Sequence, residues 1–170
     1  MRDLSRPNAL HPAWERLPRE GFEVFTPMTV KIIEQRGRHI KKQTPFIHGL
    51  LFVHATRQQL DEAVRHSETL QYRFLKGHSY GTAMTVPDAD MQRFIAAVSG
   101  IAAPRYIRPE EITPQMYGAR VRMICDGPLN AYEGRLLRVK GSGKKRLIIE
   151  LPGLLAAAVE IAAADYLELL

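Results

Sequence analysis

The histidines of this chain are the first residues to consider for chemistry, because imidazole is a common ligand of transition metals. His48 and His54 fall on the same face of an expected strand. At about 3.3 Å per residue their Cα atoms would lie roughly 20 Å apart, which is too far to share an ion. We therefore expect no metal site and no cofactor from the histidines considered, which are His39, His48, His54, His66 and His78.

Two other segments could carry chemistry. Gly141–Lys145 looks like the end of a phosphate-binding loop, but such a loop must lead into a helix whose N-terminal amides hold the phosphate. Residues 146–151 read as a strand instead, so we expect no nucleotide site. Cys125 stands next to Asp126, which disfavours a thiolate, and no activating partner is visible. The sequence therefore predicts a protein that is not an enzyme.

Basic residues gather between Lys31 and Lys42, where the chain alternates around Gly37. This pattern predicts a β-hairpin that turns at Gly37. Lys and Arg on such a hairpin can neutralise the phosphates of nucleic acid without reading its sequence. A solvated ribbon without a partner is the alternative interpretation. The residues predicted to contact nucleic acid are Arg36, Arg38, Lys41 and Lys42.

Several elements must position this hairpin. Residues 46–54 read as one strand that is apolar on both faces, and such a strand must be covered on both sides. The remaining expected elements of this part are a short helix over 13–17, a strand over 21–28, a helix over 57–67, a strand over 70–75 and a helix that begins at Pro87.

The last third of the chain has a different character. Gly100, Pro104, Pro109 and Pro114 predict a linker over 100–117. Strands are expected at 120–124, 135–140 and 146–151, with turns at Gly127-Pro128 and Gly134. We expect Asn130 to adopt the left-handed conformation in the first turn. Residues 154–164 are rich in helix formers although the last strand is expected there, so we hypothesise a helical state for this tail.

The order strand, glycine turn, strand, basic hairpin and strand resembles the KOW domain that ends NusG-type elongation factors. The segments Pro45–Thr56 and Met84–Phe94 are similar to the N-terminal domain of the UpxY family, NusG relatives that act as antiterminators on polysaccharide operons. The resemblance implies an α+β fold with a NusG N-terminal-like domain over 1–99, an antiparallel sheet with flanking helices. A linker over 100–117 and a small KOW or SH3-like β-barrel over 118–170 follow. A related factor switches its KOW domain between helical and barrel folds.

The resemblance also implies where partners bind. Residues predicted to contact the clamp region of RNA polymerase are Phe46, Ile47, His48, Gly49, Leu50 and Phe52. The predicted partner surface of the KOW turn is Gly127, Leu129, Asn130, Tyr132 and Gly134, and a ribosomal protein or termination factor is the implied partner there. The alternative interpretation is that Leu129 and Tyr132 fill the interior of the barrel. NusG-like domains open with an aromatic strand, and none precedes Arg2–Arg6. Either the start codon is placed late or the sheet lacks this strand.

Composition agrees with these expectations. A formal charge of +6 and a pI near 9.7 suit association with a polyanion. The single cysteine excludes an internal disulfide, and no long apolar run is present, so we expect a cytoplasmic monomer with no membrane partner. The leading prediction is a transcription elongation regulator. The alternative is a ribosome-associated or general RNA-binding protein that uses its KOW module.

Overall fold

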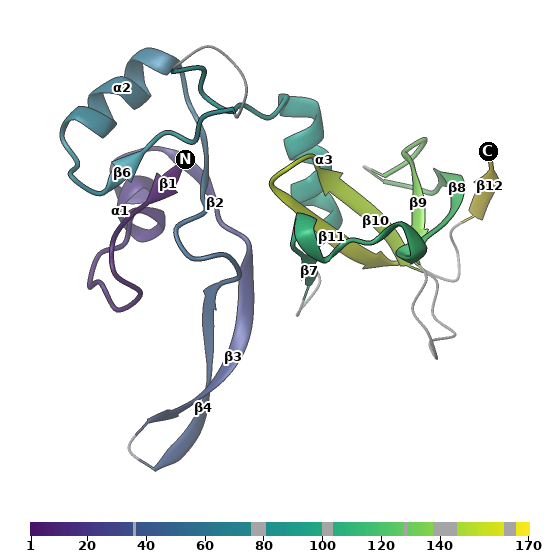
Figure 1. Ribbon diagram of the computed structural model, residues 1–170, viewed down its shortest axis with the longest axis horizontal. Coiled ribbons are helices and arrows are strands. Elements are labelled where there is room, and N and C mark those ends of the chain that lie inside the picture. Colours follow the sequence, from purple (N-terminus) through teal and green to yellow (C-terminus); the bar gives the residue numbers. More distant parts are fainter. Residues whose placement is uncertain (36, 76–80, 100–103, 128, 138–145, 162–165) are drawn as a thin grey trace. The chain divides into compact units, whose positions relative to one another are not determined.

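The computed structural model describes residues 1–35, 37–75, 81–99, 104–127, 129–137, 146–161 and 166–170 (Figure 1). The contacts of the chain divide it into two compact units, Met1–Thr85 and Val86–Leu170. The first unit contains β1 (Arg2–Asp3), α1 (Ala13–Arg19), β2 (Glu23–Phe25), β3 (Met28–Gln35), β4 (Arg38–Pro45), β5 (Phe52–His54), α2 (Arg57–Arg65) and β6 (Leu70–Gln71).

The strands of the first unit form three antiparallel pairs, β1 with β6, β2 with β5 and β3 with β4. Its core is built around Ala13 and Leu17 of α1 together with Leu51 and Leu70. The predicted helix over 57–67 is α2, which begins with a capping box in which Thr56 and Gln59 satisfy one another's backbone N–H groups. Leu60 is the buried residue of α2.

The first unit opens with a short strand that contains no aromatic residue. Arg2 and Asp3 form β1, which pairs with Gln71 and Leu70 of β6. The Asp3 N–H donates to the Gly49 carbonyl at 2.8 Å, and the N-terminal ammonium group donates to the Leu51 carbonyl at 2.9 Å. Backbone hydrogen bonds make this pairing, so it needs no aromatic sequence.

The expected continuous strand over 46–54 is wrong. Only Phe52–His54 forms a strand, and residues 46–49 turn. Gly49 has a φ of 72°, and the Leu50 N–H donates back to the Ile47 carbonyl at 3.2 Å. A left-handed residue in the middle of the run ends the alternation of side chains, so the run never presents two apolar strand faces. The expected strand over 70–75 is likewise limited to β6.

The second unit contains α3 (Asp88–Val98), β7 (Arg105–Ile107), two short 3-10 helices (Pro109–Glu111 and Pro114–Met116), β8 (Tyr117–Ile124), β9 (Glu133–Leu137), β10 (Arg146–Leu151), β11 (Leu155–Glu160) and β12 (Tyr166–Leu169). The strands form an antiparallel six-stranded sheet in the order β12-β8-β9-β10-β11-β7. The region predicted as a linker therefore contributes β7 to this sheet.

Helix α3 packs on β10 and β11 within the second unit (Figure 1). It follows Pro87, as the sequence predicts, and carries Asp88 and Asp90 in its first turn. Phe94 is fully buried, and its ring stacks against Tyr106 of β7 with centroids 6.3 Å apart. Residues 155–159 of the alanine-rich tail are buried as part of β11. The packing that buries them favours the strand over a helix. Tertiary pairing thus overrides helix propensity in β11.

Candidate functional surfaces

The predicted hairpin is present as the two-stranded ribbon of β3 and β4, paired from Met28 opposite Pro45 to Gln35 opposite Arg38. Gly37 lies in the turn with a φ of 72°. Within the first unit, the ribbon extends away from α1 and α2 (Figure 1). Among the described residues no third strand pairs with either edge. Residues 38–43 of β4 are exposed, so side chains on both faces can reach a partner.

The register divides the basic residues between the two faces of the ribbon. Residues that pair directly share a face, and faces alternate along each strand. Lys31 pairs with Lys42, and Arg38 shares their face because it precedes Lys42 by four residues. Lys41 pairs with Ile32 on the opposite face. The four predicted contacts are thus not brought together, and Arg36 lies outside the described residues.

The two faces differ in charge. The face of Lys31, Arg38 and Lys42 carries no acidic side chain among its described residues. The face of Lys41 also carries Glu34, and its Ile32 side chain is 68% exposed. Lys31 is therefore the cation that the predicted set omits. The alternation of side chains along the two strands, counted from the turn at Gly37, would have placed Lys31 on the same face as Lys42.

The predicted polymerase-binding residues form one turn that leads into β5. Phe46, Ile47 and Phe52 are half-buried, and His48 is exposed with its ring Nε2 2.9 Å from the Ser5 carbonyl. The Phe52 ring lies 6.2 Å from that of Phe25 on the neighbouring strand. Leu50 is only 2% exposed. Its side chain is buried in the interior, so Leu50 stabilises the turn by packing and is not available to a partner.

Gly49 allows this turn to approach β1. A Cβ atom at this position would collide with the Asp3 carbonyl, and the backbone also has the left-handed φ that side chains disfavour. The hydrogen bond from the Asp3 N–H to the Gly49 carbonyl shows how closely the two backbones meet. The glycine that the chain shares with its suspected relatives is therefore required for packing.

Asp3, whose backbone meets Gly49, also has a buried carboxylate side chain. It is 4% exposed, and it accepts hydrogen bonds from the N–H groups of Ala13 at 2.6 Å and Ser5 at 2.9 Å. Burial alone would raise the pKa of Asp3, but these hydrogen bonds outweigh it, and the pKa is lowered. Since Pro12 supplies no side-chain cap, Asp3 caps the start of α1.

The predicted partner turn lies between β8 and β9 of the second unit. Leu129 is buried, whereas Gly127 and Asn130 are exposed. Ala131, not Asn130, adopts the left-handed conformation, with a φ of 59°. The expectation for Asn130 is therefore wrong. Its side chain instead accepts a hydrogen bond from the Cys125 N–H at 3.3 Å and stabilises the turn from outside.

Tyr132 and Gly134 of this turn line a pocket of about 360 Å³. A Cβ atom at Gly134 would come within 2.8 Å of the Tyr132 ring and 3.2 Å of the Ile148 carbonyl, so a larger residue would require the ring to shift. Burial raises the pKa of the Tyr132 hydroxyl. The other lining residues, which no sequence pattern had singled out, are Tyr117, Arg120, Glu133, Arg135, Ile148, Glu150 and Pro152.

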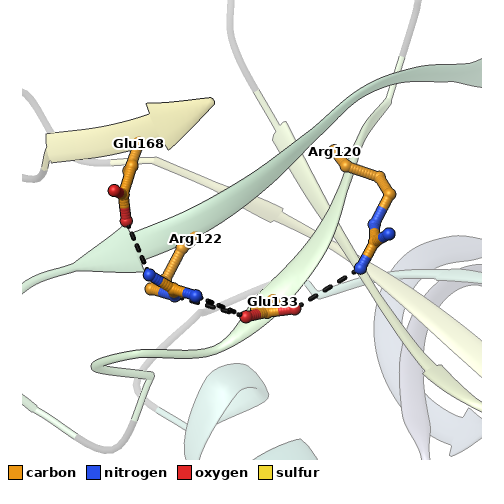
Figure 2. A network of polar contacts seen from close by, with 4 residues as sticks. All are labelled: Arg120, Arg122, Glu133 and Glu168. Carbon is orange, nitrogen blue, oxygen red and sulfur yellow. Dashed lines mark hydrogen bonds and ion pairs between the residues drawn. The ribbon is translucent and has the colours of Figure 1, made fainter. Parts of the chain in front are cut away.

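An ion-pair network borders this pocket (Figure 2). Arg122 contacts Glu133 at 2.8 Å and Glu168 of β12 at 2.8 Å, while Arg120 reaches the other oxygen of Glu133 at 3.4 Å. The hydrogen bond from Arg122 lowers the pKa of Glu133, which keeps this carboxylate ionised. The network joins β12, β8 and β9 on one face of the sheet.

Metal chemistry has no support in the described part of the chain, where no three His, Cys, Asp or Glu side chains come together as ligands. None of the helices described is both long and apolar enough to cross a membrane. The described residues instead offer a ribbon with one face that carries basic and no acidic side chains, a turn of half-buried apolar residues and a pocket lined partly by tyrosines.

The family model described as "Transcription termination factor nusG" matches residues 5–95, which is more than half of the 170 residues. The chain therefore belongs to the NusG family. Members of this family are transcription factors and not enzymes, and they bind RNA polymerase, so the chain is a regulator of transcription elongation or termination. The match includes the ribbon and the turn at Gly49. No curated protein matches the chain.

Proposed function

We propose that this NusG-family protein is an antiterminator of the UpxY type, which binds RNA polymerase and promotes processive transcription of polysaccharide biosynthesis operons. The observation that carries the proposal is the family match across the turn at residues 46–52 and the ribbon. The similarity of Pro45–Thr56 and Met84–Phe94 to UpxY proteins supports the antiterminator role.

The clamp region of the polymerase is the proposed partner of the turn. Phe46, Ile47, His48 and Phe52 are at least partly exposed and supply the contacts. Gly49 and Leu50 have a structural role: Gly49 lets the turn approach β1, and the buried Leu50 side chain packs beneath it. Half-buried apolar side chains on a turn that a hydrogen bond from Asp3 ties to β1 suit such a contact, since side chains that are already packed lose less conformational entropy when they bind.

The C-terminal part is proposed as a KOW domain with an SH3-like barrel that recruits a ribosomal protein or a termination factor. The antiparallel six-stranded sheet supports this. A tether to polymerase would raise the local concentration of such a factor without new contacts. The domain limits of 1–99, 100–117 and 118–170 remain a prediction. The family match includes most of α3, but α3 packs on β10 and β11 of the second unit, so the two findings place the boundary differently. We propose a cytoplasmic monomer.

Polymerase binding is the first test. The purified protein is expected to co-purify with RNA polymerase and not with ribosomal subunits. Ile47→Asp should weaken polymerase binding by at least about tenfold, because it places a charge in an apolar contact. Leu10→Asp is the matched control, since Leu10 is an 86% exposed apolar residue of the same unit outside the turn. Equal affinities for the two folded variants would contradict the proposed surface. Leu50→Asp would not test this surface, because it would bury a carboxylate and destabilise the fold.

The two faces of the ribbon provide a second test. Lys42→Gln should lower the slope of log K against log salt by about 0.9 for binding to an elongation complex, which corresponds to one lost contact with duplex phosphate. Lys41→Gln removes the same charge from the neighbouring residue on the opposite face and should leave the slope unchanged. Identical slopes for both variants would mean that the ribbon acts only through its total charge or makes no contact.

A further inference from the structure

The pocket of the second unit brings two arginines directly opposite one another. Arg120 of β8 and Arg135 of β9 are register partners, and both line the pocket. Like charges directly opposite on neighbouring strands destabilise a sheet. An anion placed between them would remove this repulsion, so the pair is a candidate anion site.

The carboxylates near this pair leave it incompletely neutralised. Glu133 is held at 2.8 Å by Arg122, which also pairs with Glu168, whereas Arg120 reaches Glu133 only at 3.4 Å and is 58% exposed (Figure 2). Arg135 forms no ion pair with any carboxylate of the described residues; its guanidinium lies over the Tyr117 ring, 5.3 Å from the centroid. Cationic donors therefore remain available in the pocket.

The aromatic walls of the pocket are fixed in place. The Tyr117 hydroxyl donates to Glu150 at 2.7 Å, which orients the ring and occupies one oxygen of that carboxylate. Tyr132 lies against Gly134, where a Cβ atom would displace its ring. A tyrosine ring with a guanidinium plane over it, beside incompletely neutralised cations, forms the kind of surface on which the bases of single-stranded nucleic acid stack.

We infer that this pocket binds single-stranded nucleic acid, with a phosphate between Arg120 and Arg135 and an adjacent base stacked on the layer formed by Arg135 and Tyr117. A volume of about 360 Å³ suits a group of nucleotide size. Bases inside a duplex are already stacked and cannot enter such a pocket. This inference goes beyond the proposed function, in which the C-terminal part binds a protein.

The test uses the full chain with Lys31, Arg38 and Lys42 changed to Gln, so that the ribbon contributes little to binding. Fluorescence anisotropy would measure the affinity for labelled single strands of about ten nucleotides, as RNA and as DNA, and for a duplex of the same sequence. Arg120→Gln combined with Arg135→Gln should weaken single-strand binding at least tenfold and lower the salt slope by about 0.7, which corresponds to one lost phosphate contact.

The matched control is Arg105→Gln combined with Arg108→Gln, which removes the same charge from two exposed residues of the second unit outside the pocket. It should change single-strand affinity less than twofold. Tighter binding of either single strand than of duplex, lost only in the pocket variant, supports the inference. Equal losses in both variants, or duplex bound as tightly as single strands, would overturn it.

An acidic peptide is the competing kind of ligand. If a glutamate-rich peptide binds in a manner that requires Arg120 and Arg135 while the oligonucleotides do not, the pocket recognises protein and the inference is overturned. Polymerase affinity of the same variants separates this result from the proposed function. The pocket variant should bind polymerase as well as the chain that carries only the three ribbon substitutions, because the proposed clamp contacts lie in the first unit.

Discussion

Gly49→Ala is expected to unfold the first unit or to leave it only marginally stable. The alanine must adopt a φ of 72°, which costs roughly 1–2 kcal/mol, and its Cβ collides with the backbone carbonyl of Asp3. Neither backbone can move without breaking the Asp3–Gly49 hydrogen bond and the pairing of β1 with β6. We expect a total loss above about 4 kcal/mol, most of the stability of a small domain.

The control for this prediction is Gly37→Ala. Gly37 has the same φ of 72°, but a Cβ atom there would meet nothing within 4 Å. Its cost should be limited to the roughly 1–2 kcal/mol of the left-handed conformation. Trp14 of α1 is the single tryptophan, so urea unfolding followed by its fluorescence reports on the first unit. Similar midpoints for both variants would show that the approach to Asp3 carries no energy.

The hairpin shows what a sequence can predict about this fold. Alternation around a glycine is a local signal, and it correctly located the turn at Gly37 and the basic character of the ribbon. The same local signal also separates Lys41 from Lys42, because neighbouring residues of a strand face opposite ways. Strand alternation alone therefore suffices to divide the predicted nucleic-acid set between the two faces.

The turn at residues 46–51 shows where local reasoning fails. Its apolar residues fit a buried strand, and nothing in their spacing indicates that Gly49 adopts a left-handed conformation. The cause is a tertiary contact with β1, more than forty residues earlier in the chain. Family resemblance singled out this segment for its predicted partner, and the contact with Asp3 explains why it contains a glycine.

The pocket could not have been predicted from the sequence. Arg120 and Arg135 are fifteen residues apart, and they become partners only through the β8–β9 register, which contains an irregularity between Tyr117 and Arg120. Such an irregularity changes which residues face one another, and sequence alone does not place it. Tyr132 and Gly134 were predicted as part of a turn surface, but their role in shaping a cavity depends on β10, which supplies Ile148.

Asp3→Ala is expected to destabilise the first unit by about 3 kcal/mol. Hydrogen bonds to charged groups contribute about 1.5–3 kcal/mol each, and the substitution leaves the N–H groups of Ala13 and Ser5 without their acceptor, although it also removes the cost of burying a charge. Trp14 lies directly after Ala13 in α1, so its fluorescence should detect fraying of the helix as well as global unfolding.

Asp3 also predicts how stability depends on pH. Its pKa is lower in the folded state than the ordinary value of 3.8, so the folded state binds fewer protons than the unfolded state near that pH. The contribution is fully present above pH 3.8 and is lost as the pH falls through the folded pKa. Asp3→Asn removes the titrating group and should flatten the fall in unfolding free energy below about pH 4.

Glu62→Gln is the matched control for this pH dependence, because Glu62 is an exposed carboxyl group on α2 of the same unit. It should leave the pH profile of the first unit unchanged. If Asp3→Asn and the unchanged chain lose stability in parallel as the pH falls, then the carboxylate does not hold α1 to β1 through its charge. The start of α1 would then depend on backbone pairing alone, and the turn at Gly49 would be positioned without help from Asp3.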